Sequence, residues 1–165
     1  MIRPMRGLVL VLLVAVIGVA CSDSNSSSNG GGTNSLTVTA ASPASGNGAL
    51  TNITVVQNAL SSTEFEVIIK GQVGTEYHSF DAIFITATGA AEMIEHKWGT
   101  SDPINDPAPD GWTGCVDPNC AANYSVDAAT KKVTFTSLVL TGAGLGLPTP
   151  YDVNTSTIAG TVYWP

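Results

Sequence analysis

Four aspartates gather in one long segment, and their spacing comes nearest in this chain to a set of metal ligands. The segment 99–122 reads GTSDPINDPAPDGWTGCVDPNCAA, shows no strand periodicity and carries Asp102, Asp106, Asp110 and Asp117. Three of these residues precede Pro and one precedes Gly, a pattern typical of turns in which the Asp side chain bonds its own backbone. Turn formation is the favoured interpretation. The alternative is a loop-stiffening calcium site, because Ca²⁺ binds about six to eight oxygens and this segment offers carboxylates, amides and carbonyls.

Two tryptophans in or beside this segment, Trp98 and Trp112, are the candidates for ligand contact. An exposed indole on a rigid domain can stack on the apolar face of a sugar ring, which would make the protein a glycan-binding module. Tryptophan is also a large core residue, and core packing is the favoured interpretation. Glycan binding therefore stays open as an alternative function.

Neither of the two histidines, His78 and His96, belongs to a recognisable catalytic motif. The sequence has no G-x-S-x-G nucleophile elbow and no H-E-x-x-H zinc motif, and no His follows Trp98 to help hold zinc. In a strand, Glu92 and His96 would share one face while Glu95 lies on the other, and a solvated strand surface explains all three.

A small hydrolase acting on envelope glycans is the third function considered. It would work through pairs of acids drawn from Glu64, Glu66 and Glu95. Glycoside hydrolysis needs a cleft between two carboxyl groups and a raised pKa on one of them, and the sequence indicates neither. We therefore expect a protein that is not an enzyme and has no required cofactor.

The first twenty residues have the layout of an export signal. Arg3 and Arg6 precede a stretch, 7–20, without a charged side chain. The apolar part of that stretch, 8–20, would be about 20 Å long as a helix, against a hydrocarbon core of roughly 30 Å. This segment is too short to span a bilayer comfortably, so a cleaved signal peptide at 1–20 is expected.

The signal ends in IGVACS at 17–22, which resembles the lipobox of bacterial lipoproteins. The resemblance implies cleavage before Cys21, attachment of a diacylglycerol to that cysteine and acylation of the new amino group. Two or three acyl chains would hold the protein on a membrane, since each buried methylene contributes about 0.8 kcal/mol. Ser22 in the next position implies sorting to the outer membrane of a bacterial cell envelope.

A polar tether follows the lipidated cysteine. Residues 22–35 read SDSNSSSNGGGTNS, which has nothing to bury and is typical of a flexible linker with a reach of about 20 Å. The expected organisation is a signal peptide at 1–20, a lipidated cysteine and tether at 21–35, and one folded domain at 36–165.

Cys115 and Cys120 are the cysteines that remain once Cys21 is lipidated. An even pair in an oxidising compartment predicts a disulfide, which would close a short ring inside the long acidic loop.

The domain shows strand patterns rather than helical ones. Apolar and polar residues alternate over 64–73 and 131–140, and 80–88 is apolar on both faces. Shorter candidates lie at 36–41, 50–56, 91–98 and 155–164, and a hairpin is expected between 124–126 and the strand after it. Gly and Pro punctuate these segments, which predicts a single antiparallel β-sandwich of Ig-like architecture with a long disulfide-stapled loop.

The net charge of the chain restricts the classes of partner that it can bind. Six basic and thirteen acidic side chains give a formal charge of −7, the wrong sign for binding phosphate backbones, so nucleic acid is excluded as a partner. The sequence predicts a non-catalytic lipoprotein: a tethered binding or structural module that contacts the membrane through its lipid anchor and meets a protein or glycan partner it does not identify.

Overall fold

The computed structural model describes residues 32–42, 47–120 and 123–165. The expected signal peptide, the lipidated Cys21 and the tether up to residue 31 lie outside these residues. The described chain forms antiparallel strands and two short 3-10 helices, so the all-β prediction is confirmed. No helix in the described part of the chain is long and apolar enough to cross a membrane.

The described residues form ten strands. They are β1 (Ser35–Ser42), β2 (Gly48–Ala49), β3 (Thr51–Ala59), β4 (Glu64–Val73), β5 (Glu76–Ile85), β6 (Ala91–Gly99), β7 (Gly111–Val116), β8 (Tyr124–Asp127), β9 (Lys132–Thr141) and β10 (Thr155–Tyr163). The 3-10 helices η1 (Ala143–Leu145) and η2 (Tyr151–Val153) connect β9 to β10.

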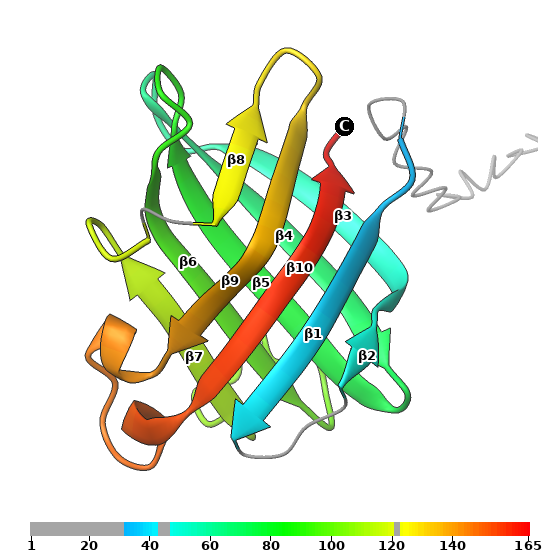
Figure 1. Ribbon diagram of the computed structural model, residues 1–165, viewed down its shortest axis with the longest axis vertical. Helices are drawn as coiled ribbons and strands as arrows, with labels where there is room; N and C mark the ends of the chain where they lie inside the picture. The colour runs from blue at the N-terminus through cyan, green and yellow to red at the C-terminus, as the bar shows by residue number, and fades with distance from the viewer. Residues whose placement is uncertain (1–31, 43–46, 121–122) are drawn as a thin grey trace, which may run out of the picture.

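One hydrogen-bonded sheet contains all of these strands, in the order β2-β1-β10-β9-β7-β6-β5-β4-β3, with β8 paired to β9. The sheet curls into a near-barrel in which β1, β8, β9 and β10 face β3, β4, β5 and β6 (Figure 1). The Ig-like sandwich of two separate sheets is not confirmed, because β7 and β9 join the two layers through the pair Gly114 and Thr141.

The chain closes the opposite side of the near-barrel at Leu50. Gly48–Ala49 pair with β1, and from Thr51 the same extended stretch pairs with β4. Leu50 is buried at this corner and donates its backbone N–H to the Leu36 carbonyl at 2.7 Å. A strand that passes from one layer to the other in this way makes a corner of the fold.

Alternating side chains fill the interior. Phe65, Val67 and Ile69 of β4 and Phe80, Ala82 and Phe84 of β5 are all buried. The Phe65 ring packs against both Phe84 and Trp164, with centroids 5.5 Å apart in each case. The alternation that predicted half-buried strands therefore sorts these residues to the core, as period-two patterning requires.

The predicted strand 64–73 coincides with β4, the other predicted strands overlap β1, β3, β5, β6, β9 and β10, and β8 pairs with β9 as the expected hairpin. The prediction that 99–122 lacks a strand is wrong in part, because Gly111–Val116 forms β7. Six register pairs with β6 hold this strand in place. A six-residue strand with two glycines is too short to show alternation in the sequence.

Candidate functional site

The disulfide between Cys115 and Cys120 is present and confirms the predicted pairing. Both cysteines are buried, and the bond closes the turn that follows β7. The backbone N–H of Asp117 in this turn donates to the Glu92 carbonyl at 2.9 Å, which fixes the turn against β6. The staple thus orders one end of the acidic segment.

Three of the four aspartates of that segment accept hydrogen bonds from backbone N–H groups. Asp102 accepts from the Ile104 N–H at 3.2 Å, and Asp106 accepts from the Ala108 N–H at 2.9 Å, both being bonds from a carboxylate to the backbone two residues on. Asp110 accepts from the Thr100 N–H at 3.2 Å, across the base of the loop. The turn interpretation holds for Asp102 and Asp106, whereas Asp110 bonds a backbone group on the other side of the loop. Within the described residues no three His, Cys, Asp or Glu side chains gather as a metal site, so the calcium alternative gains no support.

The two candidate tryptophans have different surroundings. Trp98 is only 1 % exposed and lies in the core, so its ring is not available to stack on a sugar, and the core interpretation applies. Trp112 is half-buried on the outer face of β7, where its indole N–H donates to Glu95. The Lys97 ammonium lies 4.3 Å from the centre of the Trp112 ring, and Tyr151 packs on it edge-on. One face of Trp112 is therefore occupied by a cation from its own chain.

Three carboxyl groups from adjacent strands lie in a row on this outer face. They are Glu66 of β4, Asp81 of β5 and Glu95 of β6, and we call them the carboxyl row. Asp81 stands directly opposite Glu95 in the strand register. Burial, followed by the charge of Glu66 and a hydrogen bond to it, raises the pKa of Asp81 to about 7.

The carboxyl row contains the raised pKa that a hydrolase would need, but it lacks a cleft. The Asn58 amide donates to Glu66 at 2.6 Å, and the Lys97 ammonium lies 3.4 Å from Glu95. These neighbours occupy both ends of the row. Neither of the two hollows described below is lined by a member of the row. Glu64, the third acid considered from the sequence, lies apart from the row at the rim of the second hollow.

Both histidines lie inside the near-barrel, in a hydrogen-bonded chain that the sequence did not reveal. The Nδ1 atom of His78 is 3.0 Å from Nε2 of His96, whose Nδ1 is 2.9 Å from the Ser156 hydroxyl. Ser156 is in turn 2.7 Å from the Thr113 hydroxyl. All four side chains belong to residues at most 1 % exposed, and the Phe80 ring stacks on His96 with centroids 4.2 Å apart. We call these four residues the buried polar chain.

The buried polar chain is uncharged at neutral pH. Burial lowers the pKa of His78 to about 4, and burial together with the neighbouring His78 holds the pKa of His96 well below its usual range. One consistent set of donors has Thr113 donating to Ser156, Ser156 to His96 and His96 to His78. In that arrangement Nε2 of His78 carries the last proton, and Glu76 Oε2 is 3.6 Å from it.

The interpretation of His96 as part of a solvated strand surface is wrong, because its side chain faces the core. Glu95 lies on the opposite face, as predicted. The alternation of inward-facing residues along β5 and β6 is the sequence signal that could have shown that both histidines face the core. It runs from Phe84, Ala82 and Phe80 back to His78, and from Ile94 forward to His96 and Trp98.

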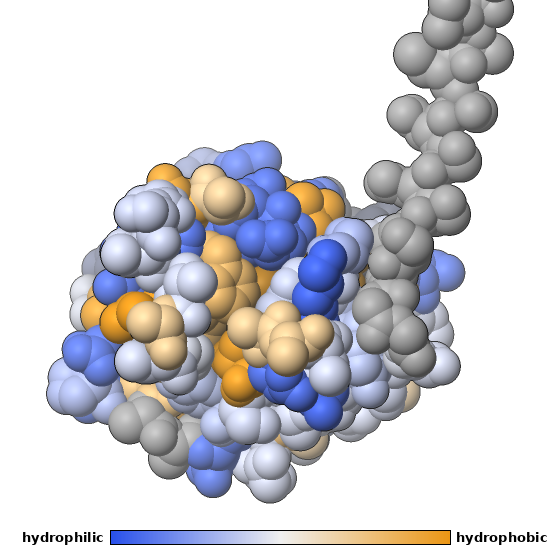
Figure 2. All heavy atoms as spheres, turned by 90° about the horizontal axis from the view of Figure 1, so that it is seen from above, coloured by the Kyte–Doolittle hydropathy of each residue, from blue (hydrophilic) through white to orange (hydrophobic). Residues whose placement is uncertain are grey.

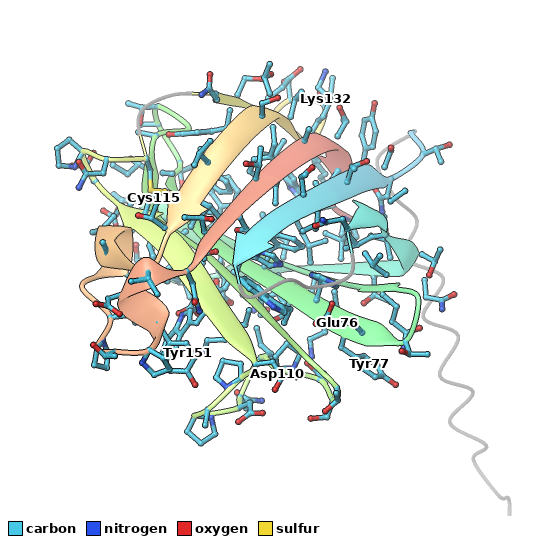
Figure 3. All side chains as sticks on the ribbon, turned by 60° about the horizontal axis from the view of Figure 1, so that its bottom comes forward. Glu76, Tyr77, Asp110, Cys115, Lys132 and Tyr151 are labelled. Atoms are coloured by element: carbon cyan, nitrogen blue, oxygen red, sulfur yellow. A yellow bond between two sulfur atoms is a disulfide. The ribbon has the colours of Figure 1, made fainter. Side chains whose placement is uncertain are left out.

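A hollow of about 250 Å³ lies at one end of the outer face of β3, β4 and β5, and we call it the β4–β5 hollow. Gln72 and Tyr77, which stand opposite each other in the register, line it, and so do Lys70 and Asp102, which form an ion pair 2.7 Å apart. Its lining consists of Asn52, Thr54, Lys70, Gly71, Gln72, Tyr77, His78 and Asp102. Figure 3 shows Tyr77 beside Glu76, projecting outward from the start of β5.

A second hollow, of about 310 Å³, lies at the other end of the near-barrel and includes Phe65 and Trp164 in its wall. Figure 2 looks onto this end and shows apolar side chains in its recessed centre with hydrophilic ones around them. Its other lining residues include Gln57, Ser61 and Lys131.

No model of a known protein family matches the chain, and neither does any curated protein sequence or any solved structure.

Proposed function

We propose that this protein is a non-catalytic binding module, held by an acylated Cys21 on the bacterial cell envelope, whose ligand site is the β4–β5 hollow. The observation that carries the binding function is the hollow itself. It brings an aromatic ring, two amides and an ion pair together around a concave surface. Concave sites with a few convergent polar groups are where proteins bind small ligands.

The position of the hollow supports the same function. Ser35, where the expected tether joins the domain, pairs with Thr161 near the end of β10. Gln72 and Tyr77, which line the β4–β5 hollow, flank the turn between Val73 and Glu76. Figure 1 shows this turn at the end of the near-barrel opposite the start of β1. A module tethered through Ser35 can therefore present the hollow away from the bilayer.

Two observations favour binding over catalysis. Ser156 is the one described serine hydrogen-bonded to a histidine, and both partners are completely buried, so a substrate cannot reach the hydroxyl. The carboxyl row has a proton donor in Asp81 but no cleft lined by it to hold a substrate. Catalysis requires a preorganised site that a substrate can enter.

The glycan-binding alternative is better supported at the β4–β5 hollow than at the two tryptophans. Trp98 is inside the core, and one face of Trp112 is covered by Lys97. Neither tryptophan offers an open ring face comparable with Tyr77, whose residue is 39 % exposed. The glycan-binding alternative therefore belongs at the β4–β5 hollow.

The anchor is tested by expressing the full chain in a bacterium with an outer membrane and supplying radiolabelled palmitate. We expect label in a protein that sediments with the outer membrane, and no label in Cys21→Ser. A wild-type protein that is exported but carries no label would contradict the anchor.

Binding is tested on the full chain in detergent micelles, by following the backbone amide resonances of β4 and β5. Three probes are added separately: methyl glucoside, glucuronate and glycylglycine. A saturable shift of these amides with at least one probe is expected. If none of the three moves them, the binding function is contradicted.

A further inference from the structure

We infer that the β4–β5 hollow binds a single ring of a neutral saccharide, an inference that rests on the proposed binding function and names its ligand class. Drug-sized ligands occupy sites of roughly 300–1,000 Å³. The hollow, at about 250 Å³, is smaller than these sites and suits one sugar ring. The chemistry of its walls selects among the small ligands that would fit.

The amides of Asn52 and Gln72 supply the pattern of donors and acceptors. The register of β3 on β4 shifts between Thr51 and Thr54, so that two residues of β3 stand opposite Gly71. Asn52, in this bulge, has a φ of 53°, and its amide donates to Gln72 Oε1 at 3.0 Å. Bulges of this kind re-aim side chains beside functional sites.

The bond between the two amides holds them in place and leaves a matched pair of groups for a ligand. That bond uses Asn52 Nδ2 and Gln72 Oε1, and within the described chain the other atoms of the two amides, Asn52 Oδ1 and Gln72 Nε2, make no hydrogen bond. One is an acceptor and the other a donor. Neighbouring hydroxyl groups on a sugar ring can each donate or accept, so a vicinal diol satisfies both amides at once.

The charges bordering the hollow cancel. The Lys70 ammonium and the Asp102 carboxylate are 2.7 Å apart, and both side chains are partly exposed, at 38 % and 48 %. A charged ligand would gain from one member of this pair and be repelled by the other. The hollow therefore favours an uncharged ligand rich in hydroxyl groups.

Tyr77 adds an apolar surface. It projects from β5 directly opposite Gln72, on the outer face of the sheet, and is 39 % exposed. An aromatic ring next to hydrogen-bonding amides matches a sugar ring, which has an apolar face and a polar edge. Dipeptides and amino acids carry two full charges and no comparable flat face, so they fit this combination less well.

The test titrates methyl glucoside, methyl galactoside and methyl N-acetylglucosaminide into the full chain in micelles and follows the β4 and β5 amides. A ligand of this size is expected to bind with a Kd on the order of 1 mM. Tyr77→Ala should weaken binding by roughly tenfold, while Tyr77→Phe, which keeps the ring, should stay within about twofold. Val139→Ala, an exposed change on β9 in the other layer, is the control and should have no effect.

Asp102→Asn gives an independent test of the charge argument, because it leaves the Lys70 cation unpaired. We expect this variant to bind glucuronate at least several-fold more tightly than the wild type does, with little change for the neutral glycosides. Wild-type binding of glucuronate or glycylglycine without any neutral glycoside would overturn the inference of a neutral saccharide and leave the binding function standing. Equal loss of neutral glycoside binding in Tyr77→Ala and Tyr77→Phe would also overturn it. A flat response to all probes would overturn both.

Discussion

At the scale of single residues, the buried histidines make the stability of this protein sensitive to acid. The pKa of His78 is lowered to about 4 in the folded state, against an ordinary value of about 6.5. Between these values the unfolded chain binds a proton that the folded protein does not, so the free energy of unfolding falls as the pH drops from 6.5 to 4. His78 alone accounts for a loss of about 3 kcal/mol.

We expect His78→Gln to be less stable than the wild type at pH 7 and to lose less stability on acidification. Urea unfolding at pH 7 and pH 4.5 measures both effects. If His78→Gln instead follows the wild type at both pH values, the acid sensitivity does not come from the buried histidine.

Asp81 has the opposite effect on how the stability of the protein changes with pH. Its pKa is raised to about 7, mainly by burial and by the charge of Glu66, so the folded protein holds a proton that the unfolded chain releases. Its contribution to stability is therefore present at acidic pH and is lost as the pH rises through 7. Asp81→Asn should stabilise the protein at pH 8 by roughly 1–2 kcal/mol, a figure reduced for solvent screening, and change little at pH 4. Thermal unfolding at the two pH values decides this, and an equal shift at both would contradict it.

At the scale of elements, the packing of β7 against β6 depends on a glycine. A Cβ on Gly111 would overlap the indole of Trp98, so this glycine is required by packing against β6. Gly111→Ala should lower the free energy of unfolding by about 2–3 kcal/mol through overpacking. Gly74→Ala is the control, because a Cβ there meets no atom within 4 Å and only the positive φ of 62° opposes it. Chemical denaturation of both variants makes the comparison, and similar losses would exclude the packing explanation.

Strands β4 and β7 differ in how far the local sequence predicts them. The bounds of β4 follow from ten residues of alternation that a half-buried strand needs. For β7, the pattern is six residues with two glycines, and its strand conformation depends on pairing with a partner distant in sequence. The β4–β5 hollow was missed for a related reason, since Asn52, Gln72 and Tyr77 come from three strands and meet only through their register.

At the scale of the whole molecule, the pairing of the first strand with the last determines how the near-barrel closes. Ser35 pairs with Thr161, and the Asn34 side chain accepts from the Tyr163 N–H at 2.8 Å, so the two ends of the domain are neighbours. No local pattern in β1 or β10 indicates this contact. The all-β prediction is confirmed but its Ig-like, two-sheet detail is not, because sequence periodicity does not specify how strands distant in the chain pair.

The neighbouring ends lead to a prediction for a circular permutant. A short Gly/Ser linker would join Pro165 to Gly32, and new ends would open in the exposed turn at 128–130 between β8 and β9. Since the join replaces one short connection with another, we expect a native-like fold with stability within about 2 kcal/mol of the linear 32–165 chain. Near-UV circular dichroism and urea unfolding measure this. A permutant without fixed aromatic signals would mean that closure depends on the β8–β9 connection rather than on the contact of β1 with β10.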